Sequence, residues 1–221
     1  YELGDAFPEA TVEPGTNLLI SGPPMTGKKR LAFETLAHGT RNGEGAIVVT
    51  TKDSADRVLE DYADHLGEGV GDLPVGVVDC VSRQQGMNAE RETDTVRYAS
   101  SPGDLTGMGI ELSELLRDFY QGRGVTENRM FLYSLSTLLM YSDLQTVFRF
   151  LHVSTGRVQS ADALGLFAID STAHDDQTMS TLKQLFDGAI EIRETDDGRE
   201  RRLDALAISE RRLLQFGLQS A

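Results

Sequence analysis

The chain has 221 residues, of which 35 are acidic and 21 basic, so its formal net charge at pH 7 is −14. This length suffices for one α/β domain with a full hydrophobic core, and we expect residues 1–221 to form a single domain. The excess of acid disfavours non-specific binding to nucleic acid or to an anionic membrane. No run is long and apolar enough to span a bilayer as a helix, and a lone cysteine, Cys80, favours a reducing compartment. We therefore expect a cytoplasmic protein.

Acidic residues are spread along the whole chain and form no acidic tail. Only four of the basic residues are lysines, namely Lys28, Lys29, Lys52 and Lys183. Such uniform acidity is typical of the solvated surface of a halophilic cytosolic protein, and an ordinary acidic protein fits the charge equally well.

Short apolar runs alternate with stretches of helical periodicity. Strands are predicted at 17–21, 46–51, 75–80, 130–133 and 164–170. Helices are predicted at 28–38, after a cap at Asp53 or Ser54, at 110–121, at 144–153 and around 179–186. The polar stretch 82–104 reads as a long loop.

The end of the chain changes character. Residues 189–194 and 201–209 flank a TDDG turn at 195–198, which predicts a β-hairpin. Alternating strands and helices indicate an α/β fold whose mostly parallel central sheet is covered on both faces and closes with this antiparallel hairpin.

Residues 21–30, SGPPMTGKKR, contain the spacing of a phosphate-binding P-loop between a strand and a helix. In such a loop, backbone N–H groups and a helix N-terminus surround phosphates while a lysine supplies positive charge. The candidate nucleotide- or phosphate-binding residues are Gly22, Met25, Thr26, Gly27, Lys28 and Lys29.

Lys29 stands where a P-loop carries the Ser or Thr whose hydroxyl holds Mg²⁺. One interpretation is a solvated lysine in the first turn of the helix. The other is an ammonium group in the place of the metal, acting as an internal counter-ion to the phosphates. Two lysines at a helix N-terminus oppose the helix dipole, and an anion would relieve that.

The stretch PGTNLLISGPPMTGKKRLAFETL at 14–36 resembles the opening of KaiC-like domains of the RecA superfamily. The resemblance continues through FRFLHV at 148–153 and LFDGAIEIRE at 185–194, and it implies a RecA-like P-loop NTPase three-layer sandwich. SPGDLTGMGI at 101–110 and GLFAIDSTAHDDQT at 165–178 resemble a halophilic-archaeal branch labelled RecA-like or HTR-like.

The chain departs from active members of that family at the positions that hold metal, polarise water and reach into the neighbouring subunit. Those positions carry Lys29, Tyr133, Lys52, Asp53, Ala207 and Ser209. Because phosphoryl transfer depends on these electrostatic contributions, the resemblance implies little or no ATP hydrolysis and no catalytic residue.

Asp53 and Asp170 are the carboxylates that could substitute for the missing ones, although helix capping or a solvated loop end also explains them. His174 with Asp175 and Asp176 lacks the dispersed ligands of a metal site and predicts a capped turn, so no metal site is assigned.

The sequence therefore predicts a catalytically degenerate KaiC-like protein, a regulatory or scaffold module whose nucleotide or phosphate binding is weak, independent of metal, or lost. ATP or ADP is the candidate ligand and Mg²⁺ is not expected. A protein partner is expected, and homo-oligomers are compatible with the family. The alternative is an active ATPase with a Mg²⁺ site rebuilt from Asp170 and Asp53.

Overall fold

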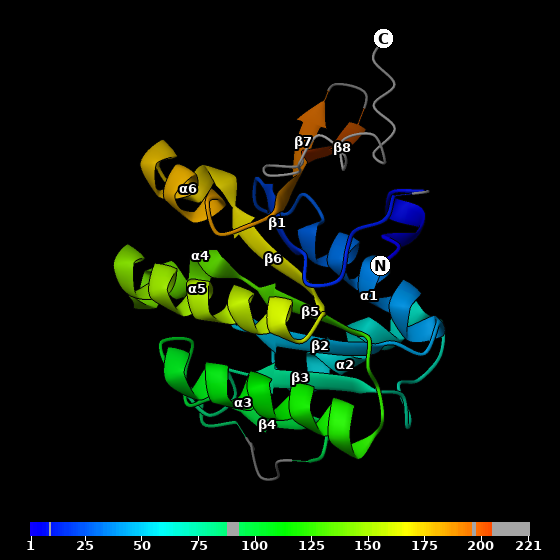
Figure 1. The fold of residues 1–221 in the computed structure, drawn as a ribbon. Helices are drawn as coiled ribbons and strands as arrows, with labels where there is room; N and C mark the ends of the chain where they lie inside the picture. Colours follow the sequence, from blue (N-terminus) through cyan, green and yellow to red (C-terminus); the bar gives the residue numbers. More distant parts are fainter. Residues whose placement is uncertain (9, 88–92, 196–197, 205–221) are drawn as a thin grey trace.

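The computed structural model describes residues 1–8, 10–87, 93–195 and 198–204. Its centre is one eight-stranded sheet in the order β4-β3-β2-β5-β6-β1-β7-β8 (Figure 1). The strands are β1 Asn17–Gly22, β2 Gly45–Thr50, β3 Val75–Asp79, β4 Val96–Tyr98, β5 Asn128–Tyr133, β6 Leu164–Asp170, β7 Gly188–Thr195 and β8 Gly198–Asp204. From β4 to β7 in this order, neighbouring strands run parallel, whereas β8 pairs with β7 in the antiparallel direction.

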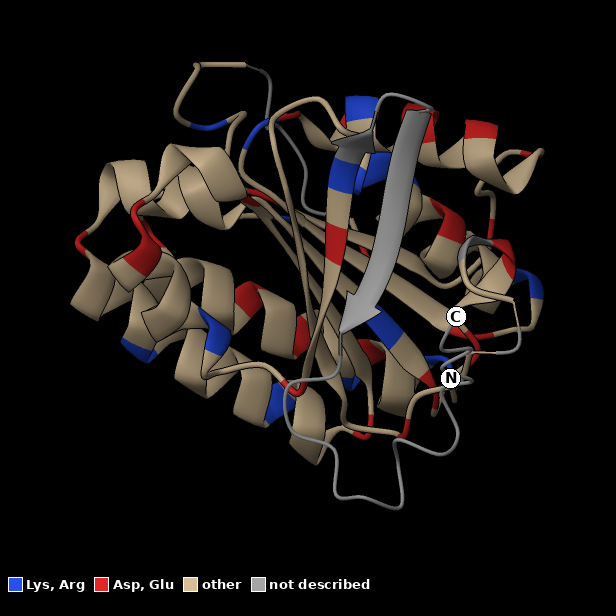
Figure 2. Ribbon diagram, turned by 90° about the horizontal axis from the view of Figure 1, so that it is seen from above, with Lys and Arg blue, Asp and Glu red and all other residues tan. Residues whose placement is uncertain are grey.

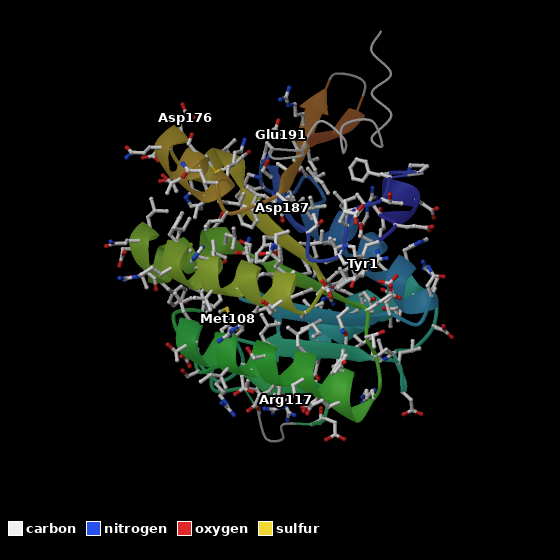
Figure 3. All side chains as sticks on the ribbon, in the orientation of Figure 1. Tyr1, Met108, Arg117, Asp176, Asp187 and Glu191 are labelled. Atoms are coloured by element: carbon white, nitrogen blue, oxygen red, sulfur yellow. The ribbon has the colours of Figure 1, made fainter. Side chains whose placement is uncertain are left out.

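Helices cover both faces of the sheet. They are α1 Lys28–Arg41, α2 Ala55–Leu66, α3 Leu105–Arg117, α4 Leu135–Tyr141, α5 Leu144–Ser160 and α6 Asp176–Lys183. Buried side chains of α1 and α2 share one hydrophobic core, and those of α3 to α6 share the other. On α3, Met108 is fully buried, whereas Arg117 is exposed (Figure 3). The fold is thus a three-layer α/β sandwich of the Rossmann or RecA-like type, which confirms the predicted class.

Covered on both faces, the central strands are apolar almost throughout. Every residue of β1 and β2 is buried, as expected for a parallel sheet between two helical layers. Helix ends follow local chemistry as well, because Ser54 caps the start of α2 and Gly67, with φ of 79°, ends it in the left-handed conformation.

The parallel registers bring the carboxyl ends of the central strands to one edge of the sheet. Gly22 of β1 lies opposite Asp170 of β6, and Thr50 of β2 lies opposite Tyr133 of β5. The loop after β1 therefore meets the ends of β2, β5 and β6 at this edge, where ligands of open α/β sheets bind.

Some predicted boundaries were wrong. The stretch 82–104, predicted as a loop, contains β4, whose three residues are held by pairing with the edge of β3 and carry too little periodicity to be recognised. The helix predicted at 110–121 begins at Leu105, because the Asp104 side chain accepts a hydrogen bond from the Gly107 N–H and caps it. The short helix α4 was not predicted.

The predicted hairpin is confirmed for β7 and β8, while its turn at 196–197 and residues 205–209 lie outside the described residues. Ala207 and Ser209 are therefore also outside them. Within the described ranges, no helix is both long and apolar enough to cross a membrane.

Candidate functional site

The loop that the sequence predicts to be a P-loop, called the P-loop below, runs from Gly22 at the end of β1 to Lys29 in the first turn of α1. Gly27 directly precedes the helix with φ of 93°, a left-handed conformation that favours glycine. At Gly22 the constraint is space, since a Cβ there would lie 2.8 Å from the backbone oxygen of Ile192 in β7. Both glycines are thus required by the shape of the loop.

Two other loop residues face in different directions. Met25 has φ of 64° and is 91% exposed, so its side chain projects into solvent. The Thr26 hydroxyl is buried and donates to the Pro23 oxygen at 2.8 Å, which stabilises the turn.

Lys28 is 4% exposed and its ammonium group is fully engaged within the protein. It donates to the backbone oxygens of Gly22 at 2.9 Å and Pro23 at 2.6 Å, and it lies 2.8 Å from Asp170 Oδ1. A lysine has three N–H donors, and here all three have acceptors. A phosphate entering the loop would have to displace at least one of them.

Asp170 ends β6 beside the P-loop and contacts two lysines. Its Oδ2 atom is 3.6 Å from Lys52 Nζ, in addition to the contact with Lys28. Burial acts to raise the pKa of Asp170, but the hydrogen bond and charge of Lys28, with a smaller contribution from Lys52, hold that pKa below its usual range. The carboxylate is therefore ionised and neutralises the P-loop lysine.

The end of the Lys29 side chain lies among acidic and aromatic side chains. Its Nζ atom lies 2.7 Å from Asp53 Oδ2 and 2.7 Å from Asp61 Oδ2. The same atom is 5.3 Å from the centroid of the Phe33 ring. Burial acts to lower the pKa of Lys29, and the hydrogen bonds to Asp53 and Asp61 outweigh it, so the pKa is raised.

These contacts bear on both interpretations of Lys29. The prediction of a simply solvated lysine is wrong, because 22% of the side chain is exposed and two carboxylates hold its end. A role as counter-ion to phosphate would require an anion to compete with two ion pairs that already balance its charge.

Tyr133, the last residue of β5, presents its ring to two ammonium groups. Lys52 Nζ is 5.0 Å and Lys29 Nζ 5.9 Å from the ring centroid. Both distances lie within the range of cation–π attraction. The aromatic face of Tyr133 thus contacts cations at the carboxyl end of β5.

The structure does not join the two candidate substitute carboxylates in one cation site. Asp53 pairs with Lys29, whereas Asp170 pairs with Lys28 and Lys52. In the described ranges of the chain, no cluster of three or more His, Cys, Asp or Glu side chains could hold a metal ion. The site instead has equal numbers of ammonium and carboxylate groups, namely Lys28, Lys29, Lys52, Asp53, Asp61 and Asp170.

Comparison with protein families places this site in context. The model of a family of unknown function, DUF7504, matches residues 15–192, which include all of these lysines and carboxylates. The chain belongs to DUF7504. No curated protein sequence matches it.

A solved structure shares the fold of this DUF7504 chain. It is the uncharacterized protein PH0321 from Pyrococcus horikoshii, crystallised in complex with an unknown peptide. The TM-score is 0.69 with 13% sequence identity, over 89% of this chain and 85% of that one. At this identity the likeness establishes the fold alone.

Two carboxylates that sequence reasoning missed organise the site of this DUF7504 chain. Asp61 lies two turns into α2 and had no motif to mark it. Asp79, fully buried at the end of β3, accepts hydrogen bonds from the backbone N–H groups of Ala55, Val81 and Ser82 and from the Ser82 hydroxyl. Asp79 thereby anchors the start of α2, the helix that carries Asp61.

The predicted capped turn before α6 is confirmed, since the Asp175 side chain accepts from the Thr178 N–H. The same segment also reaches back to the sheet. His174 Nε2 lies 2.9 Å from Ser136 Oγ, which accepts the Asp170 N–H at 2.9 Å. This DUF7504 chain thus fixes the position of Asp170 through a contact that no sequence signal indicated.

Proposed function

We propose that this protein is a non-hydrolysing P-loop domain, related to KaiC-like domains, that acts as a regulatory or scaffold module. The observation that carries the proposal is the closed state of Lys28, whose three donors are taken by two loop carbonyls and Asp170. The lysine that would meet a phosphate is already neutralised by the protein itself.

The surroundings of the P-loop support the same proposal. Stabilising a transferring phosphoryl group calls for a metal ion and charges aimed at the transition state. Here Lys29 occupies the position at which a P-loop carries the metal-holding hydroxyl. Tyr133 has an aromatic ring where the resemblance to KaiC-like domains implies a carboxylate. Each of the three lysines of the site lies within ion-pair distance of a carboxylate, so its charge is already balanced within the protein.

Any binding of ATP or ADP is expected to be weak and independent of Mg²⁺. The alternative, an ATPase with a metal site rebuilt from Asp53 and Asp170, would first require both carboxylates to leave their lysines. Among the residues that the structure describes, no contact favours that rearrangement, so it serves here as the competing outcome of the test.

A module without turnover would act through contacts with another protein, in the cytoplasm, with homo-oligomers as one arrangement. The peptide held by the Pyrococcus horikoshii protein is compatible with peptide binding by this fold. The acidic surface argues against nucleic acid as the partner.

The proposal is tested by measuring phosphate release from ATP in molar KCl, with and without Mg²⁺, for the wild type and a Lys28→Ala variant. We expect the two proteins to be indistinguishable. Thermal-shift measurements with ATP, ADP, GTP and phosphate then show whether any anion binds and whether Mg²⁺ matters. Mg²⁺-dependent turnover that Asp170→Asn abolishes would overturn the proposal in favour of the alternative.

A further inference from the structure

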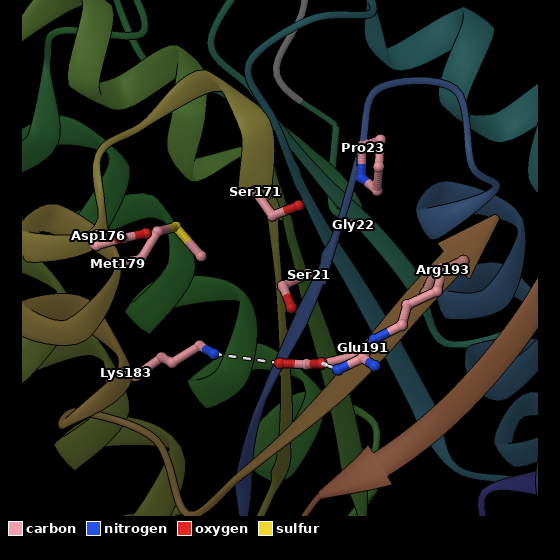
Figure 4. Close-up of a pocket in the computed structure, with 10 residues that line it drawn as sticks. Ser21, Gly22, Pro23, Ser171, Asp176, Met179, Lys183, Glu191 and Arg193 are labelled. Carbon is pink, nitrogen blue, oxygen red and sulfur yellow. Dashed lines mark hydrogen bonds and ion pairs between the residues drawn. The ribbon is translucent and has the colours of Figure 1, made fainter.

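A pocket of about 520 Å³ lies beside the P-loop, on the face of the sheet that α6 covers. Its walls come from the end of β1, the short turn after β6, helix α6 and strand β7 (Figure 4). None of the six charged groups of the P-loop cluster lines it. The pocket is therefore a site separate from that cluster.

The sheet changes from apolar to polar where it forms the floor of the pocket. Leu19 and Ala189 belong to the hydrophobic core beneath α3 to α6. Two residues further along the same strands, and so on the same face, stand Ser21 and Glu191. If this end of the sheet served only to pack against α6, apolar side chains would be expected at positions 21 and 191 as well.

Ser21 offers a hydroxyl group to a ligand in the pocket. It is 4% exposed, its side chain lines the pocket, and its hydroxyl forms no hydrogen bond to any described residue. The Ser21 hydroxyl is not one of the fully buried side-chain atoms that lack a partner, so it opens onto the space of the pocket. The hydroxyl is placed to bond a group inside the pocket.

Charged groups of both signs line the rest of the wall. Glu191 accepts from Arg193 Nη2 at 2.7 Å and from Lys183 Nζ at 3.2 Å, so one carboxylate is shared by two cations. Arg193 first, and then Lys183, outweigh burial and lower the pKa of Glu191. With Asp176 the lining has two positive and two negative side chains and is neutral as a whole.

Helix α6 holds opposite charges at the two ends of the pocket. Asp176, Met179 and Lys183 share one face because they are spaced by three and seven residues along the helix. At 1.5 Å per residue, Asp176 and Lys183 lie about 10 Å apart along the axis. Met179 supplies apolar contact between them (Figure 4).

We propose that this pocket binds a short zwitterionic peptide of about three residues, with its amino group at Asp176, its carboxylate at Lys183 and a backbone group at the Ser21 hydroxyl. A neutral lining favours a ligand whose own charges cancel, since a simple anion or cation would leave one charge unbalanced. An extended chain advances about 3.3 Å per residue, so three residues match the separation of the two charges. The pocket volume lies within the range of small-ligand sites.

The test is calorimetric titration of the full chain with trialanine, in the lowest salt at which the protein is folded. We expect binding of trialanine, and at least tenfold weaker binding of N-acetyl-trialanine and of trialanine amide, each of which lacks one terminal charge. Dialanine and tetra-alanine should also bind more weakly than trialanine. Equal binding of the free and blocked peptides, or no binding of any of them, would overturn the proposal.

Variants assign the two ends of the site. Asp176→Asn should remove the preference for a free amino group, and Lys183→Gln the preference for a free carboxylate. Asp56→Asn is the matched control, because Asp56 is also an acid in the first turn of an exposed helix and lies outside the pocket. Peptide binding is read by calorimetry and ATP turnover by phosphate release, so this proposal and that of a non-hydrolysing P-loop fail independently.

Discussion

The ammonium group of Lys28 lies 2.8 Å from the carboxylate of Asp170, which ends the strand next to the P-loop. This contact joins the two residues whose chemistry decides what the loop can bind. Asp170 thus neutralises the charge of Lys28 within the protein.

Replacing Asp170 by Asn should therefore open the loop to anions. The variant leaves Lys28 and Lys52 without their shared carboxylate and gives the cluster one net positive charge. We expect the affinity for ADP in EDTA to rise by about tenfold, which corresponds to about 1.4 kcal/mol. Calorimetry on the wild type, Asp170→Asn and the remote Asp56→Asn measures this. Unchanged or weaker binding by Asp170→Asn would contradict the inference that this pair closes the loop.

The ion pair of Lys28 with Asp170 predicts that the free energy of unfolding depends on pH. The pKa of Asp170 is lowered in the folded protein, so its contribution to stability is present above the unfolded pKa of about 3.9 and is lost as pH falls through the folded value. Urea unfolding between neutral pH and pH 3 should show a steeper loss for the wild type than for Asp170→Asn. If the free energy of unfolding falls equally with pH in both proteins, then Lys28 and Lys52 do not lower the pKa of Asp170.

Lys29 is expected to act as a tethered cation between Asp53 and Asp61. Lys29→Thr removes the ammonium group that Asp53 and Asp61 share and leaves Arg57 as the cation beside Asp61, and we expect a loss of about 1 kcal/mol in the free energy of unfolding, since the side chains are partly exposed. Mg²⁺ should then raise the melting temperature of the variant and leave that of the wild type unchanged.

The control for this rescue is the double variant Lys29→Thr/Asp61→Asn, which lacks one of the two carboxylates. It should respond to Mg²⁺ much less than the single variant does. Equal responses of all three proteins would show that the ion acts elsewhere. Turnover should not appear in any of them, because Tyr133 and Lys52 are unchanged.

Arg129 supports the opposite edge of the sheet. It is 1% exposed and forms a bidentate ion pair with Glu44, with contacts of 2.6 and 2.8 Å. Glu44→Gln leaves a buried guanidinium without its counter-charge, and we expect it to destabilise the fold by about 3–5 kcal/mol in urea unfolding. Glu60→Gln breaks an exposed pair with Arg57 and should change stability by less than about 1 kcal/mol. Similar losses for the two variants would contradict this.

Stability should also depend on salt. Acidic residues occur along helices on both sides of the sheet (Figure 2), and the mutual repulsion within a net charge of −14 grows as screening by salt falls. The unfolding midpoint is therefore expected to fall steadily from molar to millimolar KCl. A midpoint that stays flat over this range would refute the prediction.

The sequence by itself determined the layered α/β fold and the strand–loop–helix unit in which the P-loop is predicted. Apolar runs such as 17–21 and 46–51 had to be buried strands, and Gly22, Gly27 and Lys28 marked the loop between a strand and a helix. These features are local, because they depend on the period of burial and on a few residues close together in the chain. The short strand β4 was not predicted, because three residues are too few to show a periodic pattern of apolar side chains.

Only the tertiary structure decided what the P-loop lysines do. Asp170 lies 142 residues after Lys28, and Asp61 lies 32 residues after Lys29, so only the parallel registers and the packing of α2 on α1 could bring them together. The same holds for the pocket between α6 and β7, where Ser21 meets Glu191 through the pairing of β1 with β7. Spacing in a sequence reports which neighbours share a face, whereas the partner of a buried charge is set by the geometry of the whole sheet.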